Sequence, residues 1–188
     1  MSKPVKNINK TPTESTLKSA LLHLLHEKPM EKITVKELCE KSNIYRSTFY
    51  SHYKSPNELL RSIENDVLAE LKKHIWISTN TTPKNVQAHA IEFLEYIREN
   101  DYTLRVLLFS TQSKTYDFFA KAIEEEFRLI TKSAYTYLSE EYTPLFMSHG
   151  LLACIMHWIN TGYAVPAEEL AFLLVHTLHS INAIGNDM

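Results

Sequence analysis

The sequence predicts an all-α fold of about nine helices. Apolar residues recur at the spacing of about 3.6 that is typical of helices along most of the 188 residues, and no alternating stretch is long enough for a strand. Only 3 residues are glycine, which disfavours the phosphate-binding loops and hairpin turns that need a positive φ. The hydrophobic share of 44% is ordinary for a globular protein with a buried core.

Three helices are predicted near the N-terminus, over Glu14–Lys28, Val35–Lys41 and Arg46–Tyr53. The preceding residues 1–13 form a polar, basic arm that we expect to be disordered. Pro29 ends the first helix, and Thr34-Val-Lys-Glu37 is a capping box that opens the second. The residues expected to face the core of these helices are Leu17, Leu21, Leu24, Leu25, Val35, Leu38, Phe49 and Tyr53.

Six longer or more apolar helices follow, most of them announced by a proline in the first turn or by a capping residue. The fourth begins at Ser55-Pro56-Asn57-Glu58, where serine is the N-cap, and extends to about Ile77. The remaining five are predicted from Thr82-Pro83 to about Asn100, from Asp101 to about Phe109, from Ser113 to about Leu138, from Thr143-Pro144 to Thr161, and from Pro166 to just before Gly185.

Charge is distributed unevenly along the chain. Residues 1–61 hold 11 Lys and Arg against 6 Asp and Glu, a net charge of +5, whereas the rest of the chain carries −7. A basic head on an acidic body favours a polyanion as the partner of the head alone. Two cysteines without a spaced framework, and no apolar run approaching the roughly 20 residues of a bilayer span, predict a cytoplasmic protein with no membrane partner.

The second and third helices, joined by about four residues, have the layout of a helix-turn-helix, whose second helix enters the major groove of DNA. On this interpretation the residues that face base edges are Tyr45, Arg46 and Ser47. The residues expected on phosphates are Thr34, Thr48, Tyr50, Ser51, His52 and Lys54. The alternative is a three-helix packing unit with a solvated basic face.

The string Thr48-Phe49-Tyr50-Ser51-His52-Tyr53, followed by Glu58-Leu59-Leu60, resembles the DNA-binding domain of the tetracycline-repressor (TetR) family of bacterial regulators. The stretch from Phe93 to Leu178 is similar to a C-terminal domain common in regulators of low-GC bacteria. The sequence departs from the family pattern at three positions: Asn43 replaces the usual turn glycine, Tyr45 the usual serine or threonine, and Pro56 a frequent lysine. The resemblance implies a DNA-binding domain over residues 14–60 and an effector-binding and dimerisation domain over residues 61–184.

The acidic body is rich in aromatic rings, which suit either a sealed core or an apolar pocket with a few hydrogen-bonding points. The resemblance favours a pocket for some of them. The candidate effector-binding residues are Tyr102, Phe109, Phe118, Phe119, Phe127 and Trp158. The effector itself is not specified by the sequence, although the acidic balance favours a neutral or cationic molecule.

The helices over 144–161 and 166–184 are apolar almost all round, so they must be buried on most sides. Pairing two such helices from each of two chains makes a four-helix bundle, as the resemblance also implies. A homodimer with two-fold symmetry then presents two recognition helices to a palindromic operator in double-stranded DNA.

No catalytic motif is present, and we expect neither enzymatic activity nor a bound cofactor. The pairs His23/His26, Cys154/His157 and His176/His179 have metal-ligand spacing on helices, but core or interface packing is the simpler interpretation, and no metal is expected. The sequence therefore predicts a transcriptional repressor that a small molecule releases from its operator. One alternative is a helical bundle that binds or transforms a small molecule and whose basic head is incidental, and another is a structural or assembly protein that reads DNA without an effector.

Overall fold

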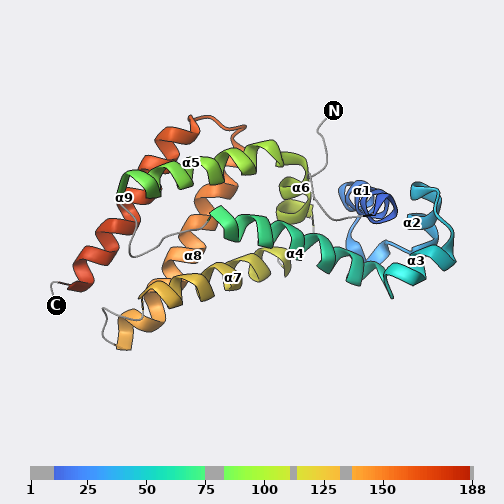
Figure 1. Cartoon of the computed structure of the whole chain (residues 1–188), viewed down its shortest axis with the longest axis horizontal. Coiled ribbons are helices and arrows are strands. Elements are labelled where there is room, and N and C mark those ends of the chain that lie inside the picture. Colours follow the sequence, from blue (N-terminus) through green and yellow to red (C-terminus); the bar gives the residue numbers. More distant parts are fainter. Residues whose placement is uncertain (1–10, 75–82, 111–113, 132–136, 187–188) are drawn as a thin grey trace. The chain divides into compact units, whose positions relative to one another are not determined.

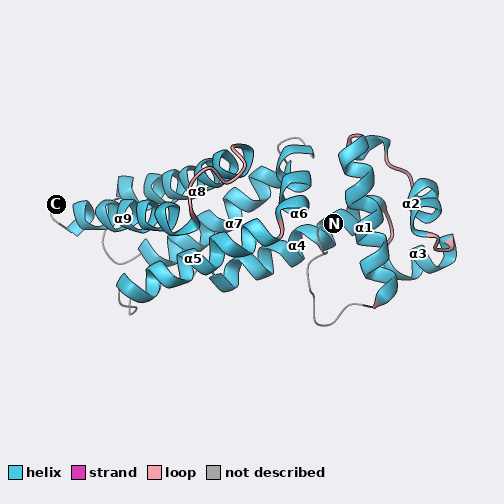
Figure 2. Cartoon of the chain, turned by 90° about the horizontal axis from the view of Figure 1, so that it is seen from above, coloured by secondary structure: helices cyan, strands magenta, loops and turns pink. Residues whose placement is uncertain are grey.

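A computed structural model describes residues 11–74, 83–110, 114–131 and 137–186, and every regular element in these ranges is helical (Figure 1 and Figure 2). The predicted all-α class is confirmed. The α-helices are α1 (Pro12–Glu27), α2 (Val35–Ser42), α3 (Arg46–His52), α4 (Pro56–His74), α5 (Pro83–Glu99), α6 (Asp101–Arg105), α7 (Lys114–Thr131), α8 (Tyr137–Asn160) and α9 (Ala167–Asn186). A 3₁₀ turn, η1 (Met30–Lys32), and a π-helical turn, η2 (Val106–Ser110), complete the described elements.

The chain divides into two compact units that differ from the predicted domains 14–60 and 61–184. The first unit comprises Met1–Ala69 and Asn100–Tyr116, and the second comprises Glu70–Glu99 and Asp117–Met188. Helices α4 and α7 each contribute residues to both units. Of the predicted basic arm, residues 1–13, the first ten residues lie outside the described part of the chain.

The core of the first unit is built from the leucine face of α1. Leu17, Leu21 and Leu25 are fully buried, as are Leu38 of α2 and Phe49 of α3, so the predicted core is confirmed at these positions. Helix α1 packs against α2 and η2, and α2 packs against α3. In contrast to the prediction, Val35 is only half-buried.

Local sequence explains where α1 and α2 start and how α2 ends. Capping boxes at Thr11/Glu14 and Thr34/Glu37 open α1 and α2, the first of them two residues before the predicted start at Glu14. Asn43 ends α2 with φ = 53°, in the left-handed conformation that asparagine tolerates better than most residues. The turn between α2 and α3 is therefore made without the usual glycine.

Two predicted boundaries in the middle of the chain are wrong. The sixth helix is α-helical only to Arg105, because a π-helical turn over Val106–Ser110 follows and its first three side chains are all buried. The seventh helix is described to Thr131; the part of its prediction over residues 132–136 lies outside the described residues, and Leu138 belongs to α8. Pro144 does not open the eighth helix but lies inside α8, where it removes one backbone hydrogen bond while its ring is buried.

The second unit is formed by α5, α8, α9 and most of α7. In both views α5 and α9 run side by side, and α9 buries two small residues, Ala167 and Ala171 (Figure 1 and Figure 2). The expected glycine at the end of α8 is confirmed, since Gly162 has φ = 68° and its N–H donates to the Ile159 carbonyl at 3.1 Å. None of the described helices is both long and apolar enough to cross a lipid bilayer.

Candidate nucleic-acid interface

Helix α3 presents a polar outer face on a fully buried anchor. Phe49 is buried in the core, whereas Tyr45, the N-cap residue, is 85% exposed. The other residues predicted to face bases, Arg46 and Ser47, are also exposed. Because one side of this short helix is held by packing, its opposite side is available to a partner.

The predicted phosphate contacts are divided by exposure. Tyr50, Ser51 and Lys54 are exposed, whereas Thr48 and His52 are half-buried. The Ser51 hydroxyl donates to the Thr48 carbonyl at 2.7 Å, so its proton is already used within α3. The Lys54 backbone N–H donates to the Glu58 carboxylate at 2.6 Å, which fixes the residue at the start of α4 while leaving its side chain to solvent.

The cations of the head differ in whether they are paired. On α2, Lys36 lies 3.8 Å from Glu40 and Lys41 lies 2.6 Å from Glu27. By contrast, neither Arg46 nor Lys54 forms an ion pair within the described part of the chain. Besides Lys32 of η1, the described cations of the head without an ion pair therefore lie at the two ends of α3, where a phosphate or a guanine edge can be met.

Thr34 stands apart from the other predicted phosphate contacts. Its hydroxyl accepts the Glu37 N–H at 3.3 Å and donates to the Glu37 carboxylate at 2.9 Å. Hydrogen bonds from Lys28 and from both groups of Thr34 lower the pKa of Glu37 to about 2. A phosphate contact by Thr34 stays a prediction. For the hydroxyl to donate to a phosphate, it must first break its hydrogen bond to the ionised Glu37 carboxylate.

Sequence reasoning missed the contribution of α1 to this surface. Glu14 of α1 places a carboxylate oxygen 3.7 Å from Nδ1 of His52 at the end of α3. The first half of α1 also lines a groove of about 420 Å³ with Ser15, Ser19 and Lys41 among its walls. The sequence signal for this contribution was the capping-box pattern Thr11-Pro-Thr-Glu14, because it places the Glu14 carboxylate at the start of α1.

The six candidate effector residues do not share one unit. Tyr102 and Phe109 belong to the first unit, and Phe118, Phe119, Phe127 and Trp158 belong to the second. Of the latter four, only Phe118 is not fully buried. Trp158 has its polar group satisfied, since Nε1 donates to the Val165 carbonyl at 2.8 Å.

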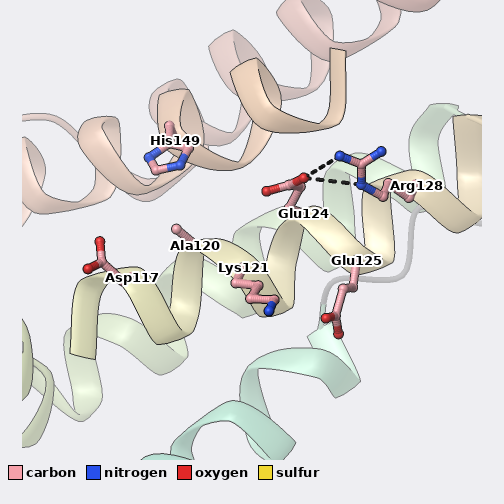
Figure 3. Close-up of a pocket in the computed structure, with 7 residues that line it drawn as sticks. All are labelled: Asp117, Ala120, Lys121, Glu124, Glu125, Arg128 and His149. Carbon is pink, nitrogen blue, oxygen red and sulfur yellow. Dashed lines mark hydrogen bonds and ion pairs between the residues drawn. The ribbon is translucent and has the colours of Figure 1, made fainter. Parts of the chain in front are cut away.

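The second unit also carries a polar groove of about 600 Å³ on α7 and α8 (Figure 3). None of the six candidate residues lines it. Its walls are formed by Asp117, Ala120, Lys121, Glu124, Glu125, Arg128 and His149. Arg128 is paired with Glu124 at 2.6 Å, and His149 comes from the facing helix α8 (Figure 3).

Apolar side chains are exposed on α8 and α9. Phe146 of α8 is 67% exposed, and Phe172 of α9 is 54% exposed. Tyr142, Leu145 and Leu173 on the same two helices are exposed as well. These helices were predicted to be buried on most sides, and the single chain buries only one face of each.

The sequence of the second half of the chain matches a family described as "Transcriptional regulator C-terminal region" (TetR_C_8), over residues 84–180. The chain belongs to the TetR family of transcriptional regulators. This is a family of DNA-binding transcriptional regulators, and its members act as dimers that respond to small molecules.

Individual relatives agree with this membership. An uncharacterised HTH-type transcriptional regulator of Bacillus subtilis (strain 168), YxbF, is 38% identical over 69 residues, which cover 36% of this chain and 18% of that protein. This chain therefore spans less than a fifth of the length of that curated relative.

Solved structures share the fold across most of the chain. A TetR transcriptional regulator from Streptococcus agalactiae 2603V superposes with a TM-score of 0.67 at 22% identity, covering 88% of this chain and 93% of that one. DhaS, a dihydroxyacetone kinase operon activator, superposes with a TM-score of 0.61 at 23% identity, covering 93% and 98%. At these identities the likeness concerns the fold alone.

Proposed function

We propose that this protein is a transcriptional repressor that binds a palindromic operator as a homodimer, in the cytoplasm, and leaves it when a small molecule binds. The observation that carries the proposal is the outer face of α3. It combines a fully exposed aromatic residue, Tyr45, with two cations, Arg46 and Lys54, that have no ionic partner among the described residues. Family membership supports the same function.

The proposed contacts divide into two kinds. Tyr45, Arg46 and Ser47 read base edges, and residues such as Tyr50 and Lys54 hold the phosphates. Replacing Arg46 by alanine should cost about 1–3 kcal/mol of binding free energy and relax the preference at one base pair. Replacing Lys54 should weaken binding to all sequences alike and reduce the dependence on salt.

The dimer is proposed to form through the segments 144–161 and 166–184, which lie within or overlap α8 and α9. The exposed apolar side chains on these helices, Phe146 and Phe172 foremost, support this assignment because contiguous exposed apolar surface marks association sites. A second copy of the chain is the occupant that two-fold DNA recognition requires.

The effector is proposed to enter the second unit near Phe118, Phe119, Phe127 and Trp158. Helix α4 begins in the DNA-binding unit and ends in the second unit, so a ligand that displaces it changes both. A coupling free energy of about 1–3 kcal/mol between the two sites is typical of such regulators. Because three of these rings are fully buried, the ligand must separate packed helices in order to bind.

The first experiment is a gel-shift titration with random duplexes at low salt, followed by selection of the bound sequences. We expect a complex, and a selected consensus with two-fold symmetry. The rival hypothesis, a small-molecule bundle with an incidental basic head, predicts no complex. A thermal-shift screen of metabolites and hydrophobic drugs, with release of the selected duplex as the second readout, then tests the effector.

A further inference from the structure

One carboxylate of α1 reaches the end of the recognition helix. Glu14 Oε2 accepts the Thr11 N–H at 3.1 Å, which holds the side chain at the start of α1. The other oxygen, Oε1, lies 3.7 Å from Nδ1 of His52. Both side chains are partly shielded, with 29% and 25% of their surfaces exposed, so solvent only partly screens their interaction.

The chemistry of the imidazole limits what His52 can do in this position. A neutral ring carries one proton, on either Nδ1 or Nε2, and only the charged ring carries both. The ionised Glu14 carboxylate can only accept hydrogen bonds, and the same is true of a DNA phosphate. Nδ1 of His52 is within ion-pair distance of Glu14 but beyond hydrogen-bond distance, so a ring that turns Nδ1 to Glu14 and Nε2 to a phosphate is most stable when both nitrogens carry a proton.

We infer that DNA binding takes up a proton at His52, and that Glu14 is the positioning residue that imposes this requirement. The inference rests on the proposed DNA-binding function and adds a pH dependence to it. Affinity should fall as pH rises through the range in which imidazole titrates, because the neutral ring turns a lone pair toward one of the two anions.

Acids on the neighbouring helix α4 have other partners and do not replace Glu14 in this role. On α4, the Glu58 carboxylate is engaged by the Lys54 N–H at 2.6 Å, and Asp66 is paired with Lys18 of α1 at 2.5 Å. The neighbouring ring on the chain, Tyr53, lies 6.2 Å from His52 between centroids. Among the described residues, Glu14 is the one acid within ion-pair distance of the imidazole.

The head offers a matched pair of variants. Glutamine is accepted at the third position of a capping box, so Glu14→Gln keeps the start of α1 while removing the charge. Its amide can donate to Nδ1 and leave the proton on Nε2, so the neutral ring suffices for a phosphate. Glu37→Gln makes the same change in the capping box of α2, at a carboxylate with no histidine partner among the described contacts.

The test measures the dissociation constant of one duplex of about 30 base pairs between about pH 6 and pH 8, for wild type, Glu14→Gln, Glu37→Gln and His52→Gln. A phosphate contact does not depend on sequence, so an arbitrary duplex at low salt is sufficient. We expect wild-type affinity to fall by up to about tenfold per pH unit for each engaged His52. Glu37→Gln should keep that slope, and Glu14→Gln and His52→Gln should flatten it.

The outcomes separate the inference from the function on which it rests. A slope in Glu14→Gln or in His52→Gln equal to that of wild type overturns the inference, even if DNA binding is intact. Absence of any complex with the wild-type protein at every pH overturns the proposed function instead. Circular dichroism of each variant, with retained helicity expected, establishes that a flattened slope does not come from an unfolded head.

Discussion

The outer surfaces of the two units differ in kind. The first unit exposes polar and aromatic side chains on a seven-residue helix, α3, and covers the apolar side of that helix with its own core. The second unit exposes phenylalanines on two long helices, α8 and α9. The first unit therefore has a complete core as a single chain, whereas the second has apolar surface left for another chain to bury.

The largest effect that this comparison predicts concerns one substitution, phenylalanine to alanine, made at a buried site of the first unit and at an exposed site of the second. Phe49→Ala removes a fully buried ring from the first unit and should cost about 3–5 kcal/mol of unfolding free energy. Phe146→Ala, in the second unit, should change the unfolding of the isolated chain by less than about 0.5 kcal/mol. Urea unfolding at a protein concentration at which both variants and the wild type are monomeric measures both, and equal losses would erase the distinction.

The next effect concerns association. Phe146→Asp combined with Phe172→Asp places charges on the exposed faces of α8 and α9, and should weaken the dimer by at least about 2 kcal/mol, or roughly thirtyfold. Tyr50→Asp is the matched control, because it charges an aromatic residue of similar exposure on α3. It should spare the dimer and abolish DNA binding. Sedimentation that shows a wild-type monomer at micromolar concentration would refute the proposed interface.

A smaller effect is expected at a buried acid in the first unit. Glu64 is only 2% exposed, and it accepts a hydrogen bond from the Thr115 hydroxyl at 2.7 Å and from Arg61 at 3.2 Å. Thr115→Val should cost about 1–3 kcal/mol, because a buried charged acceptor loses a donor. Thr16→Val, at an exposed threonine of α1, should cost far less. Similar losses in the two variants would show that burial does not decide the cost.

The smallest effect is a change in stability with pH at the surface of the head. The pKa of Glu37 is lowered from 4.5 to about 2 in the folded chain, chiefly by the Lys28 ammonium. Its contribution is therefore fully present above about pH 4.5 and is lost as pH falls toward 2. Thermal unfolding of wild type and Glu37→Gln should differ near neutral pH and converge in acid. A difference that persists at the lowest pH would contradict this linkage.

The sequence was most informative where structure depends on neighbours along the chain. Capping boxes, Pro29 and the leucines of α1 specify their helices through contacts within one or two turns, so the head helices were predicted to within about two residues. The exposed residues of α3 followed from the same periodicity. Pro144 misled because proline usually marks a helix start, whereas here it lies inside α8, where its ring is buried and tertiary packing offsets the cost of the interrupted backbone.

The sequence by itself determined the all-α class, the helix-turn-helix and the family, because these rest on local spacing and on one specific motif. Only the tertiary structure decided which packing unit holds residues 100–116, which apolar faces of α8 and α9 stay exposed, and that Glu14 lies beside His52. These outcomes join residues far apart along the chain. Helical periodicity shows which side of a helix is apolar but carries no information about which element covers it.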